Sequence, residues 1–213
     1  MGYPLGTAMP RNKTSPITRS AAAAAVLFAA VTMSRSARAD INLGAEIGVA
    51  YRASDVPGLD PGLAFGGHAE FSLLPFVRLG AYFLHYRLST EAPRDDLAYF
   101  NAFGPRLRLI VPIPGTDLLP YAQAGFGFTV ASYPGLYTPD VTTTVDERSG
   151  YFFEVPVGLG LAYEIASILH ISADFTFRPG FGHFGDAFDE DVREPNDTHA
   201  VGWSVLAGLA LDF

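Results

Sequence analysis

The feature that most constrains this chain is a repeated alternation of apolar residues with polar or small residues, at a period of two. Between Tyr151 and Ile165 every second residue is apolar, while the positions between carry Glu154, Glu164, Pro156, glycine and other residues. Successive side chains of a β-strand point to opposite faces, so such a segment has one apolar face and one polar face. Seven further segments repeat the pattern with more noise, at 41–52, 63–74, 76–88, 99–111, 121–132, 168–178 and 201–213. The sequence therefore predicts eight strands.

The connections between these segments alternate in length. Long connections at 53–62, 89–98, 133–149 and 181–198 alternate with tight turns near 74–75, 114–117 and 166–167. Eight antiparallel strands need four long loops and three short turns if both chain ends lie on the side of the short turns. Barrels of the bacterial outer membrane have short periplasmic turns and longer extracellular loops.

The polar face of these segments points to lipid, not water, as the solvent of the apolar face. It mixes glycine with charged residues, and a soluble barrel would enclose those charges while exposing a wide apolar belt. In a bilayer the apolar face meets acyl chains, and a closed barrel leaves no backbone hydrogen-bonding group unpaired. No segment reaches 18 consecutive apolar residues, as a spanning helix requires. We therefore predict an all-β fold over 40–213, an eight-stranded antiparallel up-and-down transmembrane β-barrel.

The first 39 residues differ from the rest. They contain five basic residues and no acid, an apolar run from Ala21 to Met33, and the small-residue pattern Ala37-Arg38-Ala39 before Asp40. These are the parts of a secretory signal, so we predict a cleaved signal peptide at 1–39; an N-terminal anchor or a disordered tail is the alternative. Its removal leaves nine arginines and 22 acidic residues, a net charge of −13 that disfavours nucleic-acid binding. The chain has no cysteine and cannot form disulfides.

The polar face should fill the inside of the barrel, because an eight-stranded lumen is just wide enough to be packed with side chains. Buried charges persist only when paired, so we expect a lumen charge network. Two interpretations stay open, a salt-bridged plug, which barrel size favours, and a narrow pore or acid–base site. Alternation places inward the residues Glu46, His68, Glu70, Arg106, Arg108, Gln123, Glu154, Glu164, His170, Asp174 and Arg178.

Strand register suggests partners within this set. Across the turn at 166–167, Glu154 should lie near Arg178, and Glu164 should lie near His170. Glu46 and Glu70 should be neighbours, with Arg106 and Arg108 reaching them across the lumen. In the segment 76–88, alternation alone does not decide whether Arg78 or the pair His85 and Arg87 faces outward. Pro105 and Pro156, within strands that lack a free edge, predict a local bulge at each.

One short motif raises a catalytic alternative. His170-Ile171-Ser172 resembles the His-x-Ser pattern of eight-stranded lipid A deacylases of the outer membrane. Alternation turns both side chains into the lumen, at the periplasmic end, where the outer-leaflet substrate is absent. The acidic run 186–197 does not match a calcium-binding loop. We therefore predict no catalytic, cofactor-binding or metal-binding residues.

The C-terminus carries a family resemblance. Gly208, Leu211 and the terminal Phe213 resemble the signal that the outer-membrane barrel assembly machinery reads. With the eight strands, residues 40–213 resemble the OmpA-like superfamily of small outer-membrane barrels. The resemblance implies insertion by that machinery into the bacterial outer membrane, beside its lipid and lipopolysaccharide. We expect a monomer without enzymatic activity, with a structural or surface-interaction role carried by the loops 53–62, 89–98, 133–149 and 181–198.

Overall fold

The computed structural model describes residues 41–53, 60–89, 97–133, 148–185 and 201–213. The predicted signal peptide at 1–39 and the central parts of the four long loops lie outside these residues. Within them, no helix is long and apolar enough to cross a membrane.

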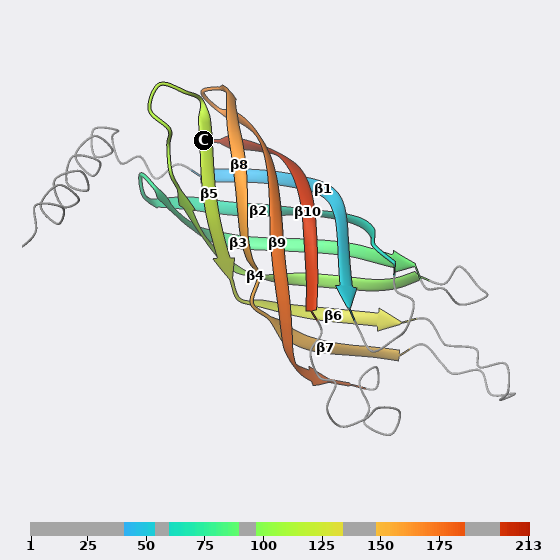
Figure 1. Cartoon of the computed structure of the whole chain (residues 1–213). Coiled ribbons are helices and arrows are strands. Elements are labelled where there is room, and N and C mark those ends of the chain that lie inside the picture. Colours follow the sequence, from blue (N-terminus) through green and yellow to red (C-terminus); the bar gives the residue numbers. More distant parts are fainter. Residues whose placement is uncertain (1–40, 54–59, 90–96, 134–147, 186–200) are drawn as a thin grey trace, which may run out of the picture. The chain divides into compact units, whose positions relative to one another are not determined.

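Ten β-elements, drawn in Figure 1, make up the eight strands of the sheet. Two of the eight are each divided in the middle, one at Phe126 and the other at Val155 and Pro156. The pairing register does not change across either division, because Arg106↔Gly125 and Phe103↔Phe128 belong to the same alignment. The elements are β1 (Ile41–Ala53), β2 (Gly62–Leu74), β3 (Val77–Ser89), β4 (Leu97–Ile110), β5 (Leu118–Gly125), β6 (Gly127–Tyr133), β7 (Arg148–Glu154), β8 (Val157–Ala166), β9 (Leu169–Phe184) and β10 (Val201–Asp212).

The sheet closes on itself. Each strand pairs antiparallel with its neighbours in sequence, and β1 pairs with β10 as well as with β2. Figure 1 shows β10, in red, between β9 and β1. Phe213 N donates a hydrogen bond to Ile41 O at 2.9 Å, so the last residue of the chain is joined to the first strand. The predicted eight-stranded antiparallel barrel is confirmed.

Side-chain burial alternates along the strands as the sequence pattern predicts. In β8, Leu159 is 70% exposed on the outer wall, although it is one of the most apolar residues of the segment. The ambiguity in β3 is resolved, since Tyr82, Leu84 and Tyr86 are buried in the lumen. Arg78 shares their face, and His85 and Arg87 therefore point outward. The β3–β4 register runs without a break from Val77 to Ser89, so no bulge changes the parity.

The expected bulges at Pro105 and Pro156 are wrong. Pro105 lies in uninterrupted register opposite Ala81, and the register is also unchanged on either side of Pro156. A proline removes one N–H donor but need not insert a residue, so the strand loses a ladder bond and keeps its alignment. The carbonyls of both prolines still accept, from Phe126 N at 3.2 Å and from Gly125 N at 2.8 Å.

The lumen contains an apolar layer that the sequence pattern did not predict. It lies in the half of the barrel that leads to the long loops, and its members are buried almost completely. The rings of Tyr86 and Phe100 stack there with centroids 4.8 Å apart and planes 4° from parallel. The layer comprises Ala50, Ala64, Tyr82, Leu84, Tyr86, Leu88, Ala98, Phe100, Ala102, Ala131, Phe152 and Leu206.

Candidate functional site

The polar part of the lumen begins with a cluster around Glu154 at the end of β7. Its carboxylate is fully buried and lies 2.7 Å from Arg52 Nη2 and 2.5 Å from Arg178 Nη1. Tyr82 Oη donates a third hydrogen bond to Glu154 at 3.1 Å. The Arg52 guanidinium also packs over the ring of Phe152, 4.4 Å from its centroid. The contact between Glu154 and Arg178 that register predicts is therefore present, joined by a second arginine.

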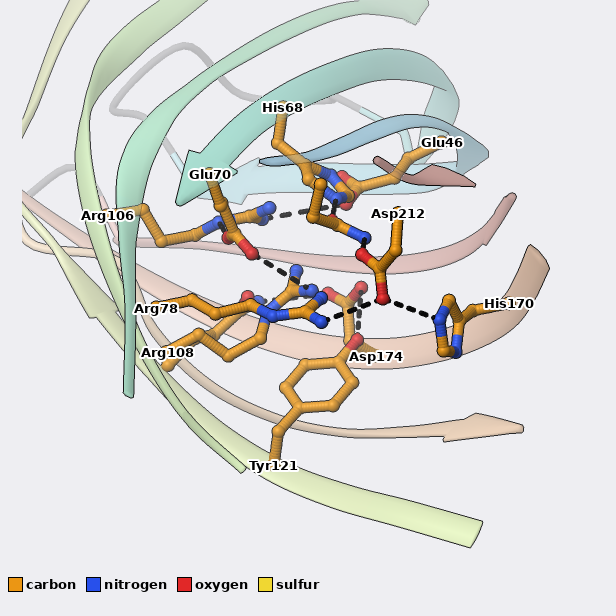
Figure 2. A network of polar contacts seen from close by, with 12 residues as sticks. Glu46, His68, Glu70, Arg78, Arg106, Arg108, Tyr121, His170, Asp174 and Asp212 are labelled. Atoms are coloured by element: carbon orange, nitrogen blue, oxygen red, sulfur yellow. Dashed lines mark hydrogen bonds and ion pairs between the residues drawn. The ribbon is translucent and has the colours of Figure 1, made fainter. Parts of the chain in front are cut away.

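A second cluster lies further toward the short turns and contains two glutamates (Figure 2). Glu46 and Glu70 are not direct cross-strand neighbours, because Glu46 lies opposite Gly66 and Glu70 opposite Asn42. Arg106 joins them, with Nε 2.8 Å from Glu70 and Nη1 3.5 Å from Glu46.

Two further side chains complete this cluster. Arg108 Nη1 lies 3.4 Å from Glu70, and His68 Nδ1 lies 2.7 Å from Glu46. Arg106 and Arg108 thus reach the glutamates as predicted.

Asp212 organises a third cluster at the periplasmic mouth, where the chain ends. Its carboxylate accepts hydrogen bonds from Asn42 Nδ2 at 2.6 Å and from Arg78 Nη2 at 2.9 Å. His170 Nε2 lies 2.7 Å from the same group, and Figure 2 shows Asp212 between Arg78 and His170. The predicted partner of His170 was Glu164, which does lie opposite it in register.

That pairing is corrected by the contact with Asp212. Glu164 is partly exposed at the mouth, where water can solvate its carboxylate, and no ion pair of Glu164 is found among the described residues. Asp212 projects into the lumen within reach of three donors. An acid surrounded by donors inside a narrow barrel competes better for the imidazole than one at the water interface.

Asp174 differs from the other buried acids of the lumen because it has no arginine partner in the described part of the chain. It accepts hydrogen bonds from Thr176 Oγ1 at 3.1 Å, from Gln123 Nε2 at 3.3 Å and from Tyr121 Oη at 3.4 Å. The three clusters hold five arginines and four acids, and Asp174 brings the acids with side-chain partners in the described lumen to five. Its formal charge is therefore balanced when the histidines are neutral.

The His-x-Ser pair lies at the periplasmic mouth. His170 and Ser172 line a small cavity of about 20 Å³ together with Arg78 and Arg108, which is space for about one water molecule. Among the described contacts there is no hydrogen bond between Ser172 and His170, and a nucleophile needs such a base. In the same residues no group of three or more His, Asp or Glu side chains is placed to hold a metal ion.

Comparison with known proteins agrees with this architecture. The sequence pattern of the family described as "Outer membrane protein beta-barrel domain" matches residues 20–209. The chain belongs to this family. It is therefore an integral protein of the bacterial outer membrane, as its sequence predicts. No curated protein matches the chain.

Solved structures share the fold of this outer-membrane barrel. Neisserial surface protein A is 12% identical with a TM-score of 0.60, over 83% of this chain and 100% of that one. The attachment invasion locus protein Ail of Yersinia pestis, in complex with the heparin analogue sucrose octasulfate, is 14% identical with a TM-score of 0.52, over 83% and 99%. The N-terminal barrel of Pseudomonas aeruginosa OprF is 14% identical with a TM-score of 0.50, over 83% and 98%.

The residues of the proposed assembly signal occupy defined places in this outer-membrane barrel. Leu211 and Phe213 are exposed on the lipid-facing wall, at 40% and 68%. Gly208 faces the lumen, where an added Cβ would lie 2.8 Å from Ser172 Oγ. The positions show a terminal strand with its apolar side chains accessible; the role of these residues in assembly stays a prediction.

Several lumen residues were not among the predicted network. Asn42 and Arg52 lie on the same face of β1 as Glu46, and Asp212 lies on the polar face of β10, so strict alternation could have found all three. Arg78 could be assigned to the lumen only if the inward-facing side of β3 was known, and the sequence left that side open. The sequence could not predict tyrosine hydroxyl partners such as Tyr82. Whether such a hydroxyl reaches a carboxylate on another strand depends on the diameter of the barrel, which the sequence pattern does not give.

Proposed function

We propose that this outer-membrane protein is a non-enzymatic and non-conducting barrel that holds four long loops at the cell surface. The packed lumen carries the proposal. Its apolar layer includes Tyr86, Leu88, Phe100 and Phe152, each at most 1% exposed. A hydrated ion would have to lose its water to pass these side chains, and transfer of a bare charge into an apolar medium is very costly.

The polar half of the lumen supports the same proposal. Each of its arginines contacts a carboxylate on another strand, and the contacts Arg52–Glu154 and Arg78–Asp212 join strands that are far apart around the barrel. Such cross-links stiffen the wall and occupy the space that a solute would need. A rigid scaffold that presents variable loops is a common arrangement for recognition.

The proposed surface role belongs to the loops 53–62, 89–98, 133–149 and 181–198, whose centres lie outside the described residues. Together these ranges contain fourteen acidic residues and three arginines. Ail of Yersinia pestis was solved with a polyanion, the heparin analogue sucrose octasulfate. The acidic loops of this chain favour cationic partners and divalent cations instead, because a polyanion would be repelled.

Conductance of the purified protein in planar bilayers tests the sealed lumen. We expect no steady nanosiemens-scale channel from the wild-type protein. The double variant Tyr86→Ala, Phe100→Ala removes the stacked rings and should raise the current above the wild-type background. A large, steady conductance of the wild type would contradict the proposal and favour the pore alternative.

Two further measurements test the remaining parts. Mass analysis of lipid A from an expressing strain should show unchanged acylation; loss of an acyl chain that Ser172→Ala abolishes would establish the enzyme alternative.

For the loops, proteoliposomes should bind a polylysine surface, and binding should fall when the six acids between 186 and 197 become amides. Equal binding by wild type and variant would remove that loop from the proposal.

A further inference from the structure

Among the described side chains of the strands, the only outward-facing arginine, histidine and amide groups lie near the extracellular end of β3 and β4. All six acidic residues within the described strands lie on lumen-facing positions. Of the six arginines whose side chains are described in these strands, five face the lumen and only Arg87 faces outward. His85 and Asn101 lie beside it on the same outward face.

These side chains are held in a fixed arrangement. His85 and Asn101 are direct cross-strand partners, and Arg87 lies opposite Tyr99 in the next pair of the ladder. His85 Nδ1 lies 2.9 Å from Asn101 Oδ1. The imidazole also packs on the ring of Phe65, with centroids 4.7 Å apart, and lies 6.1 Å from the ring of Tyr99. Aromatic rings on both sides thus fix the imidazole in its orientation.

The arrangement leaves a set of hydrogen-bond donors directed outward. Because Asn101 Oδ1 accepts from the imidazole, its Nδ2 amide group remains available as a donor. The second ring nitrogen of His85, Nε2, has no hydrogen-bond partner in the described part of the chain, and it donates only in the imidazolium form of the ring. Arg87 adds a guanidinium with five N–H donors, and no ion pair or hydrogen bond of this group is found among the described residues. Every lumen arginine, by contrast, contacts a carboxylate.

The height of this group on the wall can be estimated from strand geometry. A strand tilted by about 40° climbs about 2.5 Å per residue, and the apolar band of such barrels is about 25 Å tall. Measured from Val77 near the periplasmic rim, His85 lies about 20 Å and Arg87 about 25 Å along the membrane normal. Arg87 therefore lies at the outer boundary of the hydrocarbon, with His85 and Asn101 just inside it.

We propose that Arg87, His85 and Asn101 form a binding site on the outer wall for a phosphate group of lipopolysaccharide. The lipid A phosphates lie at the boundary where these donors point, and a planar guanidinium matches phosphate oxygens in a bidentate geometry. Tyr99 and Phe65 flank the donors with aromatic surface for the attached sugar and acyl chain. The site rests on the outer-membrane location of the barrel and is independent of whether the lumen conducts.

A solitary arginine could instead reach the aqueous interface with its long side chain, without any ligand. That explanation accounts for Arg87 alone. It leaves two polar side chains, His85 and Asn101, on the lipid-facing wall below it, where polar groups are costly unless satisfied. A phosphate can accept from Arg87 and from Asn101 Nδ2, and it also accepts from His85 Nε2 when the ring is an imidazolium, so one anion satisfies the group together.

Native mass spectrometry of the folded barrel in detergent, titrated with diphosphoryl lipid A, tests the site. We expect saturable binding of one lipid A molecule at this site, and about tenfold weaker binding for Arg87→Gln, the loss of one charge-assisted contact. His85→Leu should also weaken binding. Lipid A stripped of its phosphates should bind wild type and Arg87→Gln equally, and added inorganic phosphate should not displace the bound lipid A.

A transplanted arginine provides the matched control. Tyr51 faces lipid two residues before the end of β1, as Arg87 does on β3, but has no polar neighbours like His85 and Asn101 on the wall. The double variant Arg87→Gln, Tyr51→Arg should fold and bind lipid A no better than Arg87→Gln. Restored binding would overturn the proposal, because any interfacial cation would then suffice. Unchanged affinity of Arg87→Gln for diphosphoryl lipid A would overturn it as well.

Discussion

Replacement of Glu154 by glutamine tests whether the lumen is held by charge pairing. The substitution keeps the size of the side chain and removes its negative charge. In the wild type this carboxylate is fully buried and contacts two guanidinium groups, of Arg52 and Arg178. The variant retains both arginines in the same place but has no anion between them, and its amide N–H₂ would lie where guanidinium donors now point.

The expected cost follows from what remains after the change. Loss of one partner from a buried ion pair typically costs about 3–5 kcal/mol, because the remaining charge is left without compensation. Here two cations lose their shared partner, so Glu154→Gln should lower the free energy of unfolding by about 5 kcal/mol, the upper end of that range. Tyr82 also loses a charged acceptor, which acts in the same direction.

Denaturant unfolding in phosphatidylcholine vesicles measures this difference. The only tryptophan of the chain, Trp203, lies on the outer face of β10, so its fluorescence reports departure from lipid. Migration on a denaturing gel before and after boiling shows independently whether the variant reaches the folded barrel.

Glu164→Gln is the matched control, since it makes the same chemical change in a partly exposed glutamate. We expect a change within about 0.5 kcal/mol there. The double variant Glu154→Gln, Arg178→Met removes one surplus cation and should recover part of the loss. If Glu154→Gln unfolds within about 1 kcal/mol of the wild type, the buried cluster does not depend on its anion, and the reasoning fails.

Three further changes test other parts of the barrel. Gly48→Ala should destabilise by about 2 kcal/mol or more in the same unfolding assay, because an added Cβ would lie 2.0 Å from the backbone carbonyl oxygen of Val205 and β10 would have to move. Phe100→Ala should cost about 3–5 kcal/mol, since it empties one of the stacked rings of the apolar layer. Deletion of Phe213 should reduce the heat-modifiable fraction in isolated outer membranes, whereas removal of an equal mass from the loop 133–149 should not.

Alternation was sufficient to predict the eight strands, because a barrel wall in lipid requires a period of two along every strand. It failed where one face carries both kinds of residue. In β3 the lumen-facing side includes Leu84 and Leu88, while His85 and Arg87 face lipid. Side-chain polarity therefore gave contradictory indications of which face of β3 points into the lumen. Only the pairing with β4 decides the orientation, and pairing is a property of two distant segments.

Side-chain partners in the lumen were harder to predict than inward orientation. Register across a short turn located Arg178 beside Glu154, because the two positions are close in sequence. Arg52 joins the same carboxylate from a strand 102 positions away along the chain, which only closure of the barrel brings into reach. The apolar layer was not predicted for a related reason. In the sequence, an inward-facing Leu or Phe is an exception to the alternation of apolar and polar residues and gives no sign of a separate layer.

The distribution of charge follows from the same physics that shapes the lumen. A buried charge without a partner is too costly, so the lumen can hold buried acids only in proportion to its cations, and its described clusters together with Asp174 hold five of each. The remaining charges are mostly in the loops, where water screens them: fourteen acids and three arginines. The described part of the outer wall carries no acid, and its single described arginine lies at the edge of the hydrocarbon. The net charge of −13 expected after signal cleavage therefore belongs to the surface, not to the barrel, and acids in the loops should be far more replaceable than Glu154.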